Sequence, residues 1–240
     1  MCKSEWVRCA FLYLICLVLS GAIVLSFFLN LYEKAVVSVM SAAFNTVVIL
    51  DAGHGGEDCG AVGVNGVFEK DLNLSIAFCL RDLLVSAGVN VEMTRTEDRL
   101  LYTKEQDIKG QRKINDLKNR LLFTQSYEEA IFVSLHMNKF SQSTSFGTQV
   151  WYSDHDKAQD LAKRIQTNIK QNLQPNNHRK IKLCDSSMYL LYRSIHPSVL
   201  VECGFLSNDV ECAQLCQSEY QKQLSFVLFC AIMESVSSID

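Results

Sequence analysis

The chain contains 240 residues, 48% of them hydrophobic, which is enough material for one sizeable core and too little for two. Its 23 basic and 26 acidic residues give a net charge of -3, so charge alone indicates no nucleic-acid-binding surface. Eleven glycines and two prolines exclude collagen-like and proline-rich sequences, and the hydrophobic content argues against intrinsic disorder.

The first predicted element is a hydrophobic helix near the N-terminus. Residues 9–32 carry no charge, and Lys3 and Arg8 precede them. A basic flank before an apolar run of this length is typical of a signal peptide or a signal anchor. We therefore divide the chain into a signal peptide or anchor (1–32), a linker (33–44) and one folded domain (45–240). Cleavage after a small-residue triplet (20–22 or 41–43) and retention as an inner-membrane anchor both remain open, and both predict export to the periplasm or envelope.

Short apolar strands alternate with helices along the folded domain. A strand is predicted over residues 46–50, followed by a glycine-rich loop and a helix with apolar periodicity over 72–84. Further strands are predicted over 89–94, 131–135, 148–152 and 198–201, with helices over 156–173 and 219–236. This alternation predicts a single α/β domain. Residues 101–120 are strongly charged, and we interpret them as an exposed helical excursion with a solvated face.

The cysteines do not predict a disulfide framework. Three of the ten, Cys2, Cys9 and Cys16, lie in the N-terminal segment, and seven remain. An odd number without a CxxC pair argues against both a disulfide framework and a cysteine-ligated metal site.

Titratable residues follow three of the predicted strands. Asp51 and His54 follow the first strand, His136 the third and Glu202 the last. In open α/β sheets, functional sites lie beyond the carboxyl ends of the strands, so these side chains should converge at one edge. The glycine loop lacks both the GxGxxG order and the GK[ST] ending of phosphate-binding loops. Burial at the end of its strand is expected to raise the pKa of Glu202.

Two histidines and one carboxylate form a common catalytic zinc set with a fourth position for water. His54 and His136 can supply the imidazoles, and Glu69, where the next helix begins, can supply the carboxylate. The alternative for each histidine is a hydrogen-bonded structural role.

Six separated motifs, in order over about residues 46–238, resemble those of the zinc-dependent N-acetylmuramoyl-L-alanine amidases. The resemblance implies a twisted, mostly parallel mixed sheet flanked by helices, a zinc ion held by His54, Glu69 and His136, and Glu202 as the catalytic carboxylate. The motifs are Asp51-Ala52-Gly53-His54-Gly55-Gly56, Gly60-Ala61, Glu69-Lys70-Asp71-Leu72-Asn73-Leu74, Thr94-Arg95, Val133-Ser134-Leu135-His136-Met137-Asn138 and Val199-Leu200-Val201-Glu202-Cys203-Gly204-Phe205-Leu206-Ser207-Asn208.

The resemblance also implies an activity, which is hydrolysis of the amide between the lactyl group of N-acetylmuramic acid and L-alanine in peptidoglycan. It implies a role in cell-wall remodelling or division, with peptidoglycan or muropeptides as substrate. Further expected partners are the membrane, through the N-terminal helix, and divisome proteins, with no nucleic acid. Two alternatives are a zinc peptidase acting within the stem peptide and a non-catalytic wall-binding divisome scaffold.

Three further residues are candidates for supporting roles. Asp51 and Asn138 can orient ligand imidazoles, with loop-turn hydrogen bonding as the alternative for each. Arg193 can meet an anionic stem peptide or form a surface ion pair.

The sequence departs from the family pattern near the ligands. Ala52 replaces a usual proline, Met137 a usual small residue, and Cys203 a usual threonine or serine. Met137 is expected to narrow or reshape the cleft and so alter substrate preference. Only eight residues, 139–146, stand where regulated cell-division amidases carry a long inserted helix that blocks the zinc site. This short connection predicts a site that is open without an activator.

Overall fold

The computed structural model describes residues 12, 13, 15, 16, 18–27 and 46–236. The chain divides into two units, Met1–Ala43 and Phe44–Asp240. The described residues of the first unit are helical. No helix within the described ranges combines the length and apolar character needed to cross a membrane. The predicted linker, residues 33–44, lies outside those ranges.

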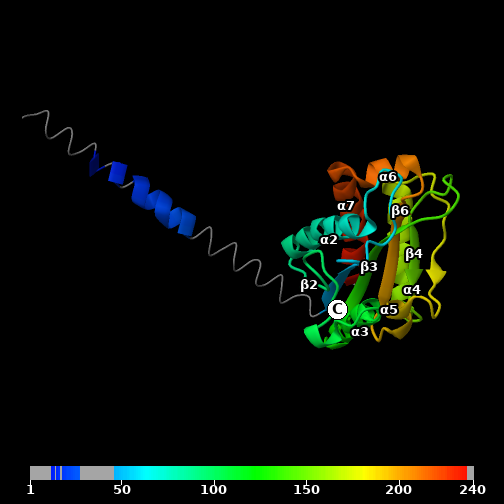
Figure 1. Ribbon diagram of the computed structural model, residues 1–240. Coiled ribbons are helices and arrows are strands. Elements are labelled where there is room, and N and C mark those ends of the chain that lie inside the picture. The colour runs from blue at the N-terminus through cyan, green and yellow to red at the C-terminus, as the bar shows by residue number, and fades with distance from the viewer. Residues whose placement is uncertain (1–11, 14, 17, 28–45, 237–240) are drawn as a thin grey trace, which may run out of the picture. The chain divides into compact units, whose positions relative to one another are not determined.

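The second unit is built on a six-stranded sheet with the order β2-β1-β3-β6-β4-β5 (Figure 1). β1 pairs in parallel with β2 and β3, β3 pairs in parallel with β6, and β4 pairs antiparallel with β6 and parallel with β5. The predicted α/β class and mostly parallel mixed sheet are therefore confirmed. The elements are β1 Val47–Ala52, α2 Glu69–Ser86, β2 Val91–Met93, η1 Lys104–Gln106, α3 Arg112–Gln125, β3 Ala130–Asn138, β4 Gln149–Tyr152, α4 Asp156–Asn172, β5 Lys182–Leu183, α5 Tyr189–Arg193, β6 Ser198–Phe205, α6 Asp209–Leu215 and α7 Ser218–Val236.

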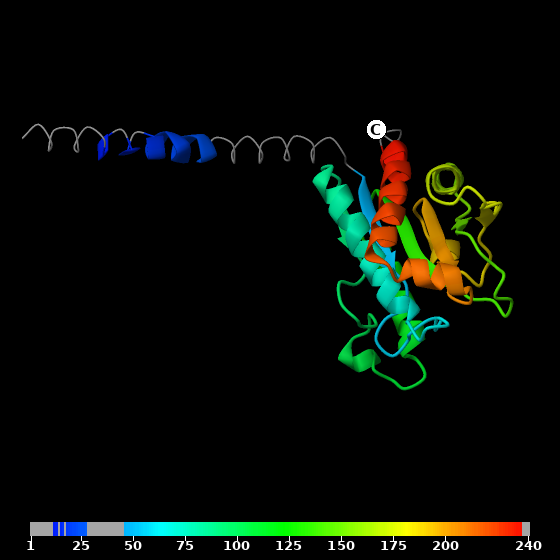
Figure 2. The same cartoon turned by 90° about the horizontal axis from the view of Figure 1, so that it is seen from above.

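Helices cover both faces of this sheet. α2, α4 and α7 pack on one face, where they form the main core with alternate residues of the central strands. α7 lies beside α2 in both views (Figure 2). α3 and α5 contribute to a second, smaller core on the opposite face. Because successive strand residues point to opposite faces, Val133 and Leu135 enter the main core while Phe132 enters the smaller one.

The three strands that carry predicted site residues are longer than predicted. β1 continues through Asp51, β3 through His136, and β6 through Glu202, because these polar residues still pair with neighbouring strands. Asp51, His136 and Glu202 therefore lie within the sheet near its carboxyl edge. β5, α5 and α6 were not predicted, since two, five and seven residues are too few to show a periodic pattern.

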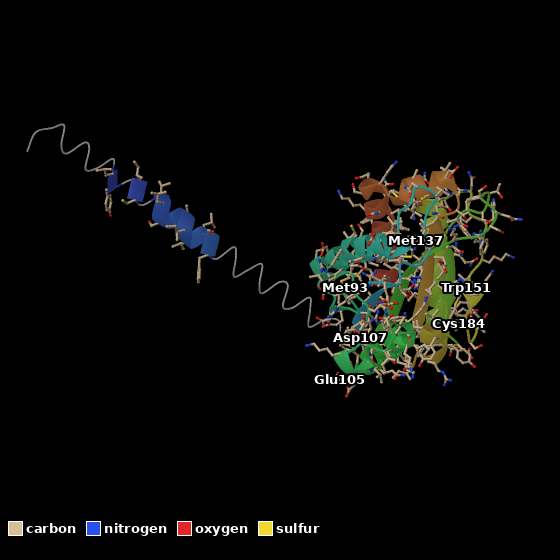
Figure 3. All side chains as sticks on the ribbon, viewed as in Figure 1. Met93, Glu105, Asp107, Met137, Trp151 and Cys184 are labelled. Carbon is tan, nitrogen blue, oxygen red and sulfur yellow. The ribbon has the colours of Figure 1, made fainter. Side chains whose placement is uncertain are left out.

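The prediction of a solvated face over residues 101–120 is only partly right. Glu105 and Asp107, labelled in Figure 3, are exposed. Asp116 and Arg120, however, are only 3% and 1% exposed, and Asp116 Oδ2 accepts a hydrogen bond of 2.9 Å from Arg120 Nε. Charged side chains can be buried in this way only when they are paired.

The expectation that Met137 narrows the cleft is wrong. Met137, labelled in Figure 3, is 4% exposed and packs in the main core. Its neighbour His136 points to the opposite face, because the two residues are consecutive on β3. Cys203 is fully buried in the same core. Both side chains therefore pack in the core, and neither lines the pocket beside His54.

Candidate active site

Three predicted ligands come together at the carboxyl edge of the sheet. His54 lies in the loop after β1, Glu69 begins α2, and His136 lies on β3. One nitrogen or oxygen from each lies within 4.8 Å of the others. Glu69 Oε1 lies 3.2 Å from His54 Nε2 and 2.9 Å from His136 Nδ1. The arrangement brings two imidazoles and a carboxylate to one point, from segments up to 82 residues apart in sequence.

Glu69 is fixed by the main chain on both sides of the site. Its side chain is 4% exposed. The Ala61 N–H donates to Oε2 at 2.7 Å, and the Met137 N–H donates to Oε1 at 2.9 Å. The carboxylate therefore joins the glycine loop, α2 and β3 in one hydrogen-bonded unit.

Two glycines, which have no side chain, make room for the three predicted ligands. A Cβ atom on Gly53 would overlap the His136 ring. A Cβ atom on Gly60, where φ is +65°, would lie 2.5 Å from Glu69 Oε2 and 2.7 Å from His54 Cδ2. Any larger residue at either position would displace one of these side chains, which explains why both positions are glycine.

Asp58 orients His54, and the sequence did not predict this role. Asp58 Oδ2 lies 2.9 Å from His54 Nδ1, which leaves Nε2 directed at Glu69. The Lys113 ammonium lies 3.0 Å from the same Asp58 oxygen. His54 itself has φ 63°, a left-handed conformation that costs a residue with a side chain about 1–2 kcal/mol.

The charges around the cluster stabilise a cation. Burial disfavours a charged imidazole, but hydrogen bonds to Asp58 and Glu69 raise the pKa of His54 to about 9. Burial likewise opposes ionisation of Glu69, yet the two histidines hold its pKa well below the usual range. An arrangement of nitrogen and oxygen donors that stabilises positive charge between them fits a divalent metal ion.

Glu202 lies beside the ligand cluster. It is paired with His136 in the parallel register of β3 and β6, so both side chains point to the same face of the sheet. Its Oε2 atom is buried and has no hydrogen-bond partner within the described ranges. Burial raises the pKa of this carboxyl to about 7, despite the opposing effect of His136. Glu202 can therefore accept and release a proton near neutral pH.

A pocket of about 50 Å³ adjoins the cluster and is lined by His54, Asp58, Lys113, His136 and other residues of β1, α3 and α5. Arg193 does not line it, and its exposed guanidinium lies 6.0 Å from the Tyr192 ring.

The Asn138 carbonyl accepts a hydrogen bond from Leu206, and no hydrogen bond joins the Asn138 side chain to an imidazole across residues 46–236.

Asp51 was predicted to orient a ligand imidazole. Its carboxylate instead accepts hydrogen bonds from an arginine and two hydroxyl groups. Arg120 Nη1 and the Thr94 hydroxyl donate to its Oδ1, each at 2.6 Å, and the Ser134 hydroxyl donates to Oδ2 at 2.6 Å. Burial alone would raise the pKa of Asp51, but Arg120 and the two hydroxyl groups lower it to about 2. The carboxylate stays ionised inside the protein because this network satisfies it.

Acid is expected to destabilise the protein through Asp51. Its pKa of about 2 lies below the ordinary value of about 3.9. The resulting stabilisation, about 2.5 kcal/mol, is present above about pH 4 and is lost as the pH falls towards about 2. Urea unfolding of the metal-free protein between about pH 6 and about pH 3 measures this loss. Asp51→Asn should unfold more easily and show a flatter pH dependence; an unchanged slope would contradict the assignment.

Asp58→Asn should weaken metal binding. An asparagine can still meet His54 Nδ1, but it removes the negative charge that fixes the ring and raises its basicity. We expect about a 10- to 100-fold loss of zinc affinity, measured by competition with a chromogenic chelator. Asp98→Asn is a matched control, since Asp98 also binds this loop, at Gly56 N–H, without touching a ligand. Equal losses in both variants would show that loop anchoring, and not ring orientation, is responsible.

Comparisons with known proteins identify the family to which the chain belongs. The sequence profile of the N-acetylmuramoyl-L-alanine amidase family, Amidase_3, matches residues 48–233. The germination-specific N-acetylmuramoyl-L-alanine amidase of Bacillus subtilis is 35% identical over 188 residues, covering 78% of each chain. The CwlD amidase of Clostridioides difficile, solved in complex with the GerS lipoprotein, has a TM-score of 0.77 and 39% identity, covering 82% of this chain and 100% of that one. The amidase AmiC2 of Nostoc punctiforme has a TM-score of 0.69 and 27% identity, covering 80% and 97%. The chain therefore belongs to the N-acetylmuramoyl-L-alanine amidase family and is an enzyme of that family.

Proposed function

We propose that the protein hydrolyses the amide between the lactyl group of N-acetylmuramic acid and L-alanine, with zinc held by His54, Glu69 and His136. The observation that carries this proposal is the convergence of the three ligand atoms within 4.8 Å, beside a carboxyl group with an unpartnered oxygen. When bound, zinc makes water a nucleophile near neutral pH and polarises the carbonyl to be attacked. The His-Glu-His donor set suits this metal.

Glu202 acts in this proposal as the general base and then as the general acid. It takes a proton from the attacking water and returns that proton to the leaving nitrogen of L-alanine. A pKa of about 7 suits both steps, because the group is then able to hold or release a proton at neutral pH. Its register opposite His136 supports a role beside the proposed ligands and not among them.

The site is proposed to work without an activator. The connection over residues 139–146 contains no helix or strand. Its Phe140 is anchored at the end of β6, since the Phe140 N–H donates to the Ser207 hydroxyl and the Phe140 ring lies edge-on to Phe205 with centroids 5.0 Å apart. None of its residues lines the pocket beside His54.

We further propose that the enzyme acts outside the cytoplasm, in cell-wall remodelling or division. The uncharged run over residues 9–32 supports export, with cleavage or membrane anchoring as the two outcomes. The CwlD amidase was solved with a lipoprotein bound, which supports a search for a protein partner here.

Digestion of purified sacculi by the full chain, with and without a chelator, tests three proposals together. These are the requirement for a metal, the bond that is cut and activity without an activator. The expected products are stem peptides with free L-alanine amino groups and glycans with unsubstituted lactyl groups, identified by mass. Chelator should stop the reaction and zinc should restore it. Cleavage within the stem peptide would instead support the peptidase alternative. Binding without any cleavage, even with zinc added, would support the scaffold alternative.

A further inference from the structure

Two buried arginines lie beneath the segment that leads to His54. Arg95 follows β2 and is 2% exposed, and Arg120 lies on α3 and is 1% exposed. They come from different elements, yet both direct their guanidinium groups at the main chain of residues 52–54. Neither has a part in the proposed proton transfers or in metal ligation.

Together the two guanidinium groups bind three consecutive carbonyls. Arg120 Nη1 donates to the Ala52 carbonyl at 2.9 Å, and Arg120 Nη2 donates to the His54 carbonyl at 2.8 Å. Arg95 Nε donates to the Ala52 carbonyl at 2.8 Å, and Arg95 Nη2 donates to the Gly53 carbonyl at 3.1 Å. The planar fork of a guanidinium can bridge separate acceptors in this way, whereas an ammonium cannot match its geometry.

The buried charges that hold Arg120 are balanced. Asp51 accepts from its Nη1 at 2.6 Å and Asp116 from its Nε at 2.9 Å, so the two arginines and two aspartates sum to no net charge. Asp116 is fixed in turn by the Leu101 N–H, at 2.7 Å. The two aspartates therefore hold the Arg120 guanidinium in one orientation, and its other hydrogen bonds fix the main chain at Ala52 and His54.

This contact bears directly on His54. Within the described residues, His54 is the one non-glycine residue with a positive φ, 63°. In this conformation its carbonyl meets Arg120 while its ring reaches Asp58 and Glu69 on the other side. If the main chain relaxed to a right-handed or extended conformation, the His54 carbonyl would leave Arg120 and the imidazole would leave Glu69.

We propose that Arg120, assisted by Arg95, is a positioning residue that holds residues 52–54 in the strained conformation that presents His54 Nε2 to the metal. This inference rests on the proposed function, in which His54 is a zinc ligand. It assigns a role to α3, which brings Arg120 to the loop from 66 positions further along the sequence.

The test compares Arg120→Met and Arg120→Lys with a control that weakens the fold elsewhere. Ile165→Ala on α4 is suitable, because Ile165 is fully buried in the main core and α4 packs against α7, β4 and β6. Zinc affinity of the full chain is measured by chelator competition, the visible spectrum of the Co²⁺-loaded protein reports the ligand geometry, and thermal unfolding of the metal-free proteins reports stability. Zn²⁺ and Co²⁺ alone are the probes, so no peptidoglycan is needed.

Arg120→Met is expected to lose about 10- to 100-fold in zinc affinity and to change the Co²⁺ spectrum. Arg120→Lys, which keeps the charge but not the fork, should fall between it and the unsubstituted protein. Ile165→Ala should unfold at a lower temperature with unchanged affinity and spectrum. If Arg120→Met does not fold, the decision rests on Arg120→Lys.

Two results would overturn the inference. One is unchanged zinc affinity and an unchanged Co²⁺ spectrum in the folded Arg120 variants. The other is an equal loss of affinity in Ile165→Ala, which would show that general stability controls metal binding. A failure of the unsubstituted protein itself to bind zinc would contradict the proposed function, and is therefore distinguishable from both.

Discussion

Replacing Glu202 by glutamine is expected to lower kcat by about 10²- to 10⁴-fold, the usual contribution of a general acid–base group. Glutamine has nearly the same shape but cannot take a proton from water or return one to the leaving nitrogen. Because Glu202 is placed beside the ligands and not among them, zinc affinity should stay within a few-fold of the unsubstituted value. Release of muropeptide amino groups measures the rate, and chelator competition measures the affinity.

Glu211→Gln provides a matched control for that experiment. Glu211 is also a buried carboxyl whose pKa is raised by burial, but it accepts hydrogen bonds from the Gly147 and Phe205 N–H groups on the far side of β6. Its substitution should cost stability and leave kcat nearly unchanged. A Glu202→Gln variant that still cleaves at the original rate would remove Glu202 from the mechanism.

Glu69→Ala should abolish both zinc binding and hydrolysis, and should also destabilise the metal-free protein. The second effect follows because alanine leaves the buried N–H group of Met137 and the partly buried N–H group of Ala61 without their acceptor. Each such loss costs about 1–3 kcal/mol, so the free energy of unfolding should fall by about 2–6 kcal/mol. Metal analysis and urea unfolding in the presence of chelator measure the two effects separately.

His54→Ala is the comparison that separates these two roles of Glu69. It removes a proposed ligand, so zinc binding should fall as well, but no main-chain N–H group loses a partner. Metal-free His54→Ala should therefore be more stable than metal-free Glu69→Ala. Equal stabilities would show that the carboxylate does not brace the main chain.

Much of the site could be predicted from the sequence because three of its residues come at or just after the ends of apolar strands. The rule that sites lie beyond the carboxyl ends of strands brought His54, His136 and Glu202 to one edge, and the structure places them there. The α/β class could be predicted from the alternation of strands and helices, because the apolar pattern of each long element is visible in the sequence. Apolar periodicity marks buried elements reliably when they are long.

The supporting residues were harder to predict, because their roles depend on pairing between distant segments. Arg120 lies in a charged stretch that reads as solvent-facing, and its partner Asp51 is 69 residues away. One signal was available, since Asp116, Arg120 and Thr124 recur every four residues on one face of α3, and all three are buried. A carboxylate within an apolar strand also requires a buried partner. Asp58 gave no comparable signal beyond its place four residues after His54.

Consecutive side chains of β3 point to opposite faces of the sheet, so neighbouring residues of this strand are subject to different constraints. The His136 side chain lies against Glu69, whereas the Met137 side chain packs in the main core, where its size and shape determine the fit. Exchange of Met137 for leucine or isoleucine should alter thermal stability by a small amount and leave the choice of substrate alone. Adjacent residues of β3 therefore differ in what a substitution affects, which is the proposed metal site at His136 and the packing of the main core at Met137.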